Sequence, residues 1–432
     1  MPTAPLRALR RAVSGPVLVA LVVLSSLSLT GCTSDDVSPV PPDVSPGASR
    51  MEPKPAGGPG DILVAGRAVT GSEPSGIPKA PFRRTYTDGE VYASVTGYRS
   101  LSFGAAGVES IRRTELDAGR DVPTTIDPAA QRAAFDGLRG RTGAAIAVDV
   151  RTGEIVALVS APSYDPGSFA GNTGADAEMW RRLQSAEPRP LLNRAVREAE
   201  NPGGAAHLVV AAAALEKGLV RSVDTPTRSP LAYAIPGTTT RINGPSPRCE
   251  NADLRIALKH GCGNVFAALA ADLGAGPLES TARALGFNDD NLKTPVRAAE
   301  SVWPSDPPSR ADLALTANGL ADVTATPIQL ALLLATLSNA GARPAPRLLA
   351  TPDAPADTRR ALSPRTAVQL SGALSAPLTA RVPATGTTWS LSTAHTPSGR
   401  TLAVVVTLAA TNDTAADTTA AATAIAHRVT AG

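Results

Sequence analysis

Apolar residues along this chain follow two periods, and the order of these periods predicts the fold. Residues 143–150 and 154–160 are β-rich and apolar or alternating, and a turn at residues 151–153 predicts that they form an antiparallel hairpin. Residues 401–408 are β-branched and apolar, which is typical of a central strand. Helical patterns lie between these strands. We therefore predict an α/β (α+β) fold, an antiparallel sheet flanked by helices with a helical subdomain inserted in the sheet.

Capping residues mark where the helical patterns begin and end. Asp127 can cap a first helix that starts at Pro128 and continues through Leu138. An Ala-rich, almost wholly apolar stretch at residues 205–217 predicts a buried helix that Gly218 closes. Further helices are expected at residues 254–273, 325–341 and 365–374, and from a cap at Asn412 or Asp413 to Val429.

The start of the chain lacks this globular pattern. Three Arg residues precede an apolar run at residues 16–29, which ends in Leu-Thr-Gly-Cys at residues 29–32. At about 14 residues, the run is short for a helix that must cross roughly 30 Å of hydrocarbon. It resembles a bacterial lipoprotein signal, which implies a signal peptide at residues 1–32 and a lipid on Cys32. Cleavage is favoured, and an uncleaved anchor stays open.

The rest of the chain divides by composition. Residues 33–60 are rich in Pro, Gly and Ser, which predicts a disordered tether. Residues 61–120 are expected to form a small N-terminal module, and residues 121–432 the main domain. The lipid would hold the mature protein in an extracytoplasmic position, on the outer face of the cytoplasmic membrane.

Composition limits the partners and the chemistry. A chain of 432 residues with 43% hydrophobic residues can bury a sizeable core. The net charge of +3 is spread without a Lys/Arg block, so a nucleic-acid partner is not expected. No pair of the 4 His residues has metal-ligand spacing, so neither a metal nor a cofactor is expected. Cys249 and Cys262 could pair in an exported protein, and the spacing alone leaves this open.

Several segments of the chain resemble, in order, the frame of the class B penicillin-binding proteins. The resemblance implies the transpeptidase fold that this family shares with the serine β-lactamases. It also implies three motifs around one cleft: S-x-x-K with the nucleophile and its base, S-x-N, and K-T-G on the strand at the edge of the cleft. The segments that carry it are residues 191–195, 202–218, 257–267 and 323–332, with a junction-like stretch at residues 86–98 and 104–109.

Alignment by the residues on either side of each motif places the first two motifs on residues that lack the expected side chains. The S-x-x-K motif falls on Gly204 and His207, and the S-x-N motif falls on Gly261 and Gly263. A shift by one residue would bring Cys262 and Asn264 to the second motif instead, at the expense of the match to the residues that follow.

The third motif falls on residues 384–387, where Ala384 replaces the Lys and Thr385, Gly386 and Thr387 are kept. No Lys in the chain has a Ser three positions before it, and no Lys follows Lys293. The resemblance therefore predicts that the chain is not an enzyme. It predicts instead a scaffold or regulator that works with other proteins of peptidoglycan (cell wall) synthesis. The alternatives are weak binding of stem peptides through the two Thr residues, and residual D,D-transpeptidase or carboxypeptidase activity through other groups.

Overall fold

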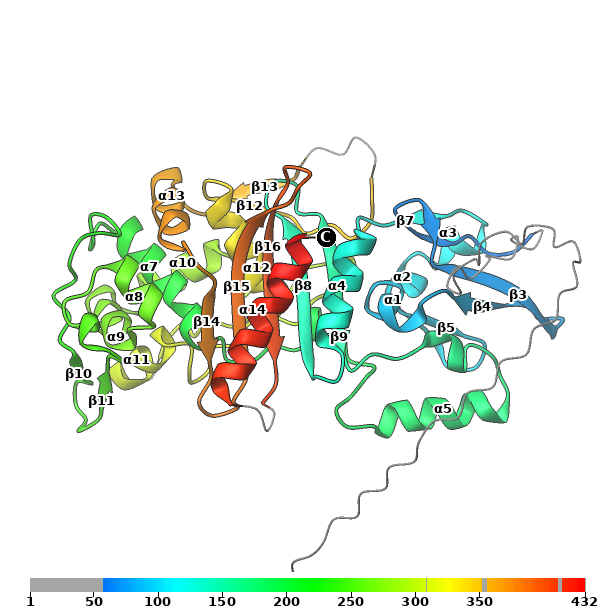
Figure 1. The fold of residues 1–432 in the computed structure, drawn as a ribbon, viewed down its shortest axis with the longest axis horizontal. Coiled ribbons are helices and arrows are strands. Elements are labelled where there is room, and N and C mark those ends of the chain that lie inside the picture. Colours follow the sequence, from blue (N-terminus) through cyan, green and yellow to red (C-terminus); the bar gives the residue numbers. More distant parts are fainter. Residues whose placement is uncertain (1–56, 308, 352–355, 411–413, 432) are drawn as a thin grey trace, which may run out of the picture. The chain divides into compact units, whose positions relative to one another are not determined.

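Figure 1 shows a computed structural model of the chain, which describes residues 57–307, 309–351, 356–410 and 414–431. The predicted signal peptide, Cys32 and most of the predicted tether lie outside these residues, as do the predicted caps Asn412 and Asp413. Within the described residues, no helix is both long and apolar enough to cross a membrane.

The central sheet has five strands in the order β14-β15-β16-β8-β9, and every neighbouring pair is antiparallel. The predicted hairpin is confirmed by β8 and β9, and the predicted central strand by β16, which lies between β15 and β8. An antiparallel sheet of N- and C-terminal strands is therefore confirmed. The strands are β8 (Gly143–Asp149), β9 (Ile155–Ala161), β14 (Leu378–Arg381), β15 (Thr388–His395) and β16 (Thr401–Leu408).

Helices cover both faces of this sheet. Successive residues of a strand point to opposite faces, and in β8 and β9 the residues on both faces are buried. Ala145 and Ala147 pack with α4 (Pro128–Leu138) and α14 (Ala415–Ala431) in one apolar cluster. Ile146 and Val148 belong to the other, larger cluster, which contains α12 (Pro327–Ser338). Figure 1 shows α14, in red, lying along the sheet beside α4. The sheet is thus buried on both faces, as in a three-layer α/β/α arrangement.

The first helix begins where the sequence predicts. The carboxylate of Asp127 accepts hydrogen bonds from the backbone N–H groups of Ala129 and Ala130, so it caps α4. The last helix is capped by Thr414, whose hydroxyl accepts from the N–H of Asp417 at 3.2 Å.

A helical subdomain lies in sequence between β9 and β14, as predicted. The helix expected at residues 254–273 is two helices instead, because Gly261 adopts a φ of 62° and ends the first of them. Besides α12, the helices between β9 and β14 are α5 (Gly174–Ser185), α6 (Arg194–Arg197), α7 (His207–Glu216), α8 (Leu254–His260), α9 (Gly263–Leu273), α10 (Ala275–Ala284), α11 (Arg310–Ala317) and α13 (Pro364–Ala373). The 3₁₀-helices are η1 (Pro166–Phe169), η2 (Gly203–Ala206) and η3 (Pro247–Cys249). There are also two small hairpins, β10 (Ala232–Ala234) with β11 (Arg241–Asn243) and β12 (Ala342–Pro344) with β13 (Thr358–Arg360).

The residues before α4 form short strands and helices around a buried ion pair. Arg84 Nε donates to Glu109 at 2.7 Å, and both side chains are almost completely buried. Residues 89–96, part of the junction-like stretch, form helix α1. The elements are β1 (Ile62–Val64), β2 (Arg67–Ala68), β3 (Thr70–Ile77), β4 (Ala80–Tyr86), α1 (Gly89–Thr96), β5 (Tyr98–Ser100), β6 (Gly104–Ala106), α2 (Gly107–Ile111), α3 (Arg113–Asp117) and β7 (Val122–Pro123).

Candidate functional site

The segment that carries Gly204 is a 3₁₀ turn, η2, that leads into the buried helix α7. Gly203 has a φ of 52°, and its N–H donates to the carbonyl of Gly319 at 3.1 Å. A side chain on Gly319 would collide with the backbone of Gly203, so these two glycines are required by close packing. Gly204 is under no such restraint. A Cβ on Gly204 would lie 3.5 Å from Ala380 and 3.5 Å from the ring of His207, which is ordinary contact.

His207 is packed under Gly204, and only 4% of its surface is exposed. Its ring stacks on Phe266 with the ring centroids 4.0 Å apart. Its Nε2 lies 3.1 Å from Oδ1 of Asn318. Burial lowers the pKa of the His207 imidazole to about 4, and the hydrogen bond that its ring makes to Asn318 opposes this only in part. The ring is therefore neutral at physiological pH.

Asn318 is a site residue that the motif alignment did not identify. Its Nδ2 donates to the carbonyls of Ala314 and Gly263, so Oδ1 is the acceptor that faces His207. A Cβ on Gly263 would collide with this Oδ1. Asn318 thus fills the space that a side chain at position 263 would take. In the sequence it lies at the end of a helix, just before a glycine, which is typical of a helix cap.

In the second motif region, Cys262 and the amide nitrogen of Asn264 are engaged in structure. A disulfide joins Cys249 and Cys262, the pairing that the sequence left open. The side chain of Asn264 is buried, and its Nδ2 donates to the carbonyls of Pro230 and Cys249. The alternative register therefore places a bonded sulfur and a structural amide at this motif. Gly261, in contrast, borders open space, since no atom lies within 4 Å of where its Cβ would be.

The residues predicted to form the third motif lie in a turn next to the strand at the edge of the sheet. Residues 384–387 form the turn between β14 and β15, where Thr387 Oγ1 lies 3.0 Å from the hydroxyl of Thr385. The N–H of Gly386 donates to the carbonyl of Val382, which closes the turn. The strand at the edge of the sheet is β14, and Ala380 of this strand is the residue that meets Gly204. The structure therefore brings Gly204, His207 and Gly263 together through Asn318. The residue of the edge strand that meets Gly204 is Ala380, and residues 384–387 lie in the turn beyond this strand.

A polar pocket of about 220 Å³ lies between the end of α8 and the start of β14; we call it the α8–β14 pocket. Gly261 lines one side, and Lys259 and His260 lie beside it. Ser375 and Thr379 line the other side, and no carboxylate belongs to its lining. The pocket is therefore suited to an anionic group.

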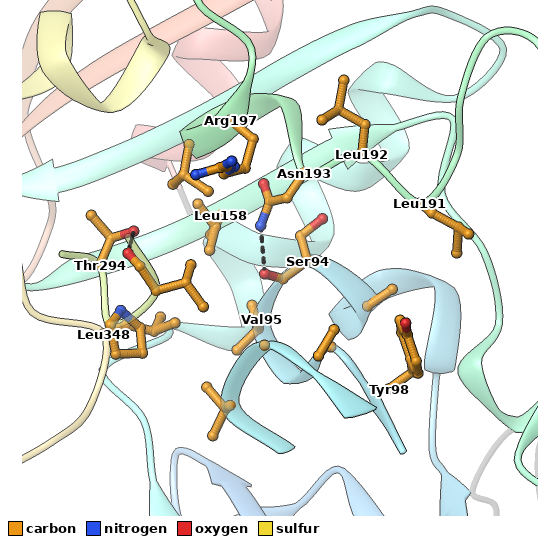
Figure 2. A pocket seen from close by; sticks show the side chains of 18 of the residues that line it. Ser94, Val95, Tyr98, Leu158, Leu191, Leu192, Asn193, Arg197, Thr294 and Leu348 are labelled. Carbon is orange, nitrogen blue, oxygen red and sulfur yellow. Dashed lines mark hydrogen bonds between the residues drawn. The ribbon is translucent and has the colours of Figure 1, made fainter. Parts of the chain in front are cut away.

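A second pocket, of about 420 Å³, contains none of the motif positions (Figure 2). It lies between α1 and the segment before α6, where Asn193 Nδ2 donates to the carbonyl of Ser94 at 2.9 Å. Its lining is mainly apolar, with Val95, Leu158 and Leu348 among the residues that Figure 2 labels. Among the described residues, no group of three or more His, Cys, Asp or Glu could hold a metal ion.

Comparisons with known proteins agree with this arrangement. Residues 143–376 match the penicillin binding protein transpeptidase domain, and residues 59–132 match the penicillin binding protein A dimerisation domain. The chain is 33% identical over 330 residues to the peptidoglycan D,D-transpeptidase PbpA of Mycobacterium tuberculosis, covering 67% of each chain. It is 27% identical to MrdA of Escherichia coli over 286 residues, 63% of this chain and 44% of that relative. A crystal structure of PBPA from M. tuberculosis matches with a TM-score of 0.76 and 29% identity, over 86% of this chain and 98% of that chain.

These relatives correct the prediction that the chain is not an enzyme. Those compared here are named peptidoglycan D,D-transpeptidases, and one structure of penicillin-binding protein A is an imipenem acyl-enzyme complex, with a TM-score of 0.74 and 29% identity. The prediction depended only on the side chains at the three motif positions. Because the matching domain extends over more than half of the chain, and because a relative of 33% identity is covered over two thirds of its length, this chain belongs to the penicillin-binding protein transpeptidase family.

Proposed function

We propose that the chain recognises the stem peptides of peptidoglycan during cell-wall synthesis, and that it binds them in the α8–β14 pocket. The proposal is supported by the relatives, whose names assign them to peptidoglycan D,D-peptide chemistry. Peptidoglycan lies outside the cytoplasmic membrane, so the proposal also places the chain there. The observation that carries it is the carboxylate-free lining of the α8–β14 pocket, which includes Lys259 and lies at the start of the edge strand β14.

A stem peptide ends in a free carboxylate, and the α8–β14 pocket offers groups that suit one. The ammonium of Lys259 can pair with it, and the hydroxyls of Ser375 and Thr379 can donate hydrogen bonds to it. Thr379 is exposed on the edge strand, whose next residue meets Gly204.

Equilibrium binding of an acetylated peptide that ends in D-Ala–D-Ala tests the proposal. We expect saturable binding by calorimetry, and at least about tenfold weaker binding by Lys259→Ala, since a hydrogen bond to a charged group contributes about 1.5–3 kcal/mol. Lys79→Ala is the matched control, because Lys79 is exposed in the turn between β3 and β4. Absence of saturable binding by the wild-type protein would overturn the proposal.

Two further expectations from the sequence stay predictions. Lipid anchoring at Cys32 predicts that Cys32→Ala moves the protein from the membrane to the soluble fraction. A scaffold or regulatory role is favoured by the match of residues 59–132 to a dimerisation module. Co-purification of other cell-wall synthesis proteins with the intact chain, lost when residues 59–132 are deleted, would support that role.

A further inference from the structure

The pocket of about 420 Å³ between α1 and α6 is large enough for a small organic ligand; we call it the α1–α6 pocket. Its lining is mainly apolar. Val95 and Val108 come from α1 and α2, and Leu158 and Val196 come from β9 and α6. An apolar cavity holds water poorly, because each water needs several polar partners. The pocket is therefore suited to an apolar group.

Backbone contacts fix the walls of this pocket. Gly97 and Gly107 line one wall, with φ values of 73° and 63°. Their backbones approach so closely that a Cβ on Gly97 would collide with the carbonyl oxygen of Ala106. The amide of Asn193 joins the opposite wall to this one, because it donates to the carbonyl of Ser94 at 2.9 Å (Figure 2). The pocket is therefore formed before a ligand binds, which reduces the entropy that binding must offset.

The lining carries positive charge and no negative charge. Arg197 and Arg297 belong to it, and no Asp or Glu does. The charge of Arg297 is matched, since its Nη2 lies 3.0 Å from Oδ2 of Asp290. Arg197 is exposed, and no carboxylate of the described residues pairs with it. Its Nη1 donates to the backbone carbonyl of Arg297 at 3.0 Å, which leaves its other N–H groups available to an anion.

The unmatched charge lies at one side of the apolar lining. Figure 2 shows Arg197 on the side of Asn193 and Leu158, away from Tyr98. An inorganic anion would pair with Arg197 and leave the apolar walls uncovered, whereas a neutral apolar molecule would cover the walls and leave the guanidinium without an anion. A molecule with an apolar body and one acidic end satisfies both parts of the pocket.

We propose that the α1–α6 pocket binds a fatty acid, with the carboxylate on Arg197 and the alkyl chain along Val95, Val108 and Leu158. The volume of about 420 Å³ is near the lower end for ligand pockets, which favours an acid with a single chain over a phospholipid with two. The proposal does not depend on the binding of stem peptides, because the α1–α6 pocket shares no lining residue with the α8–β14 pocket.

Calorimetric titration of the intact protein with decanoate, below the concentration at which it forms micelles, is the test. We expect saturable binding, and about fivefold weaker binding by Arg197→Gln, because the glutamine amide can still donate to the carbonyl of Arg297 but carries no charge. Decan-1-ol has the chain without the charge and should bind equally to the wild type and Arg197→Gln. Acetate has the charge without the chain and should not bind at the same concentrations.

Two control variants locate the binding. Arg365→Gln is the matched control for charge, because Arg365 is exposed on α13 and its Nη2 also donates to a backbone carbonyl, that of Arg221 at 3.4 Å. Lys259→Ala tests whether decanoate binds in the α8–β14 pocket instead. Both variants should bind decanoate as tightly as the wild type does.

A variant that fills the pocket tests the position of the chain. Val296 is half-buried in the lining, and its carbonyl accepts from the N–H of Thr294 at 2.7 Å, a bond that any side chain at position 296 leaves in place. In Val296→Trp, decanoate and decan-1-ol should both bind more than about tenfold more weakly, because the indole occupies the space of the chain. Circular dichroism checks that this variant is folded, and Arg197→Gln decides the proposal if it is not.

The outcomes separate this proposal from the proposed function. Absence of saturable decanoate binding by the wild-type protein, equally tight decanoate binding by Arg197→Gln, or weakened binding by Lys259→Ala would overturn the fatty-acid site. None of these results bears on stem peptides, whose binding is titrated separately with the acetylated peptide. Weaker binding by Arg197→Gln, with Arg365→Gln and Lys259→Ala unchanged, supports the site.

Discussion

Gly203 and Gly204 are neighbours that differ in backbone conformation. Gly203 has a positive φ of 52°, which is unfavourable for any residue with a Cβ. Gly204 lies outside the left-handed region, and a Cβ there would make only ordinary contacts. Glycine at position 204 is therefore required neither by backbone conformation nor by steric exclusion.

This difference predicts opposite effects of the same substitution. Gly204→Ala should raise the free energy of unfolding by about 0.4–1 kcal/mol, because alanine restricts the unfolded chain more than glycine does. Gly203→Ala should lower it by about 1–2 kcal/mol, because alanine must adopt a left-handed conformation. Urea denaturation of both variants beside the wild type measures the two values. Equal destabilisation by both would contradict the backbone assignment of this turn.

At the residue scale, part of the candidate site could be predicted from the sequence. Gly204, His207 and Gly263 could be found from their flanks, and the structure brings them together. Asn318 could not be found, because its role depends on a contact between residues 111 positions apart in the chain. Only the absence of a side chain at Gly263 gives a hint, since some other group must then fill that space.

At the scale of elements, a disulfide and a hydrogen bond hold the junction of α8 and α9 against η3. The disulfide between Cys249 and Cys262 attaches η3 to the junction. The amide of Asn264 donates to the carbonyl of Cys249 at 2.9 Å, beside the same disulfide. Because Gly261 and Gly263 lie on this junction, the disulfide also stabilises one wall of the α8–β14 pocket.

Removal of the disulfide should therefore destabilise the helical subdomain. It closes a loop with a sequence separation of 13 residues, for which the chain-entropy estimate is about 3 kcal/mol. We expect the double variant Cys249→Ala/Cys262→Ala to unfold at lower urea concentration, with a loss of about 2–3 kcal/mol. Reductant should lower the stability of the wild-type protein and leave the double variant unchanged. A reduced wild-type protein as stable as the oxidised one would contradict this prediction.

The sequence predicts the long elements better than the short ones. The strands β8, β9 and β16 and the helices α4 and α12 follow clear apolar periods, and all are present. β14 has only four residues at the edge of the sheet, with alternate positions exposed, so its pattern is too short to recognise. The residues to which the third motif was assigned, with their Thr-Gly-Thr, form the turn that follows this strand. The fold could be predicted, whereas the strand that meets Gly204 could not.

At the scale of the whole molecule, burying a neutral His207 links the stability of the fold to pH. The folded-state pKa of about 4 is below the ordinary value of 6.5, so between these pH values the unfolded chain binds more protons than the folded one. The contribution of this histidine to stability is thus complete above pH 6.5 and is lost as the pH falls toward 4. The loss reaches about 3 kcal/mol and does not increase further at lower pH.

Comparison of the wild-type protein with His207→Gln isolates this effect. Burial raises the pKa of Glu109, which works in the opposite direction over part of the same range, so the wild-type curve alone is not sufficient. The free energy of unfolding should fall more steeply between pH 6.5 and 4 in the wild type than in His207→Gln. Parallel curves for wild type and His207→Gln would show that His207 binds its proton equally well in the folded state. The lowered pKa that burial gives the His207 imidazole would then be ruled out.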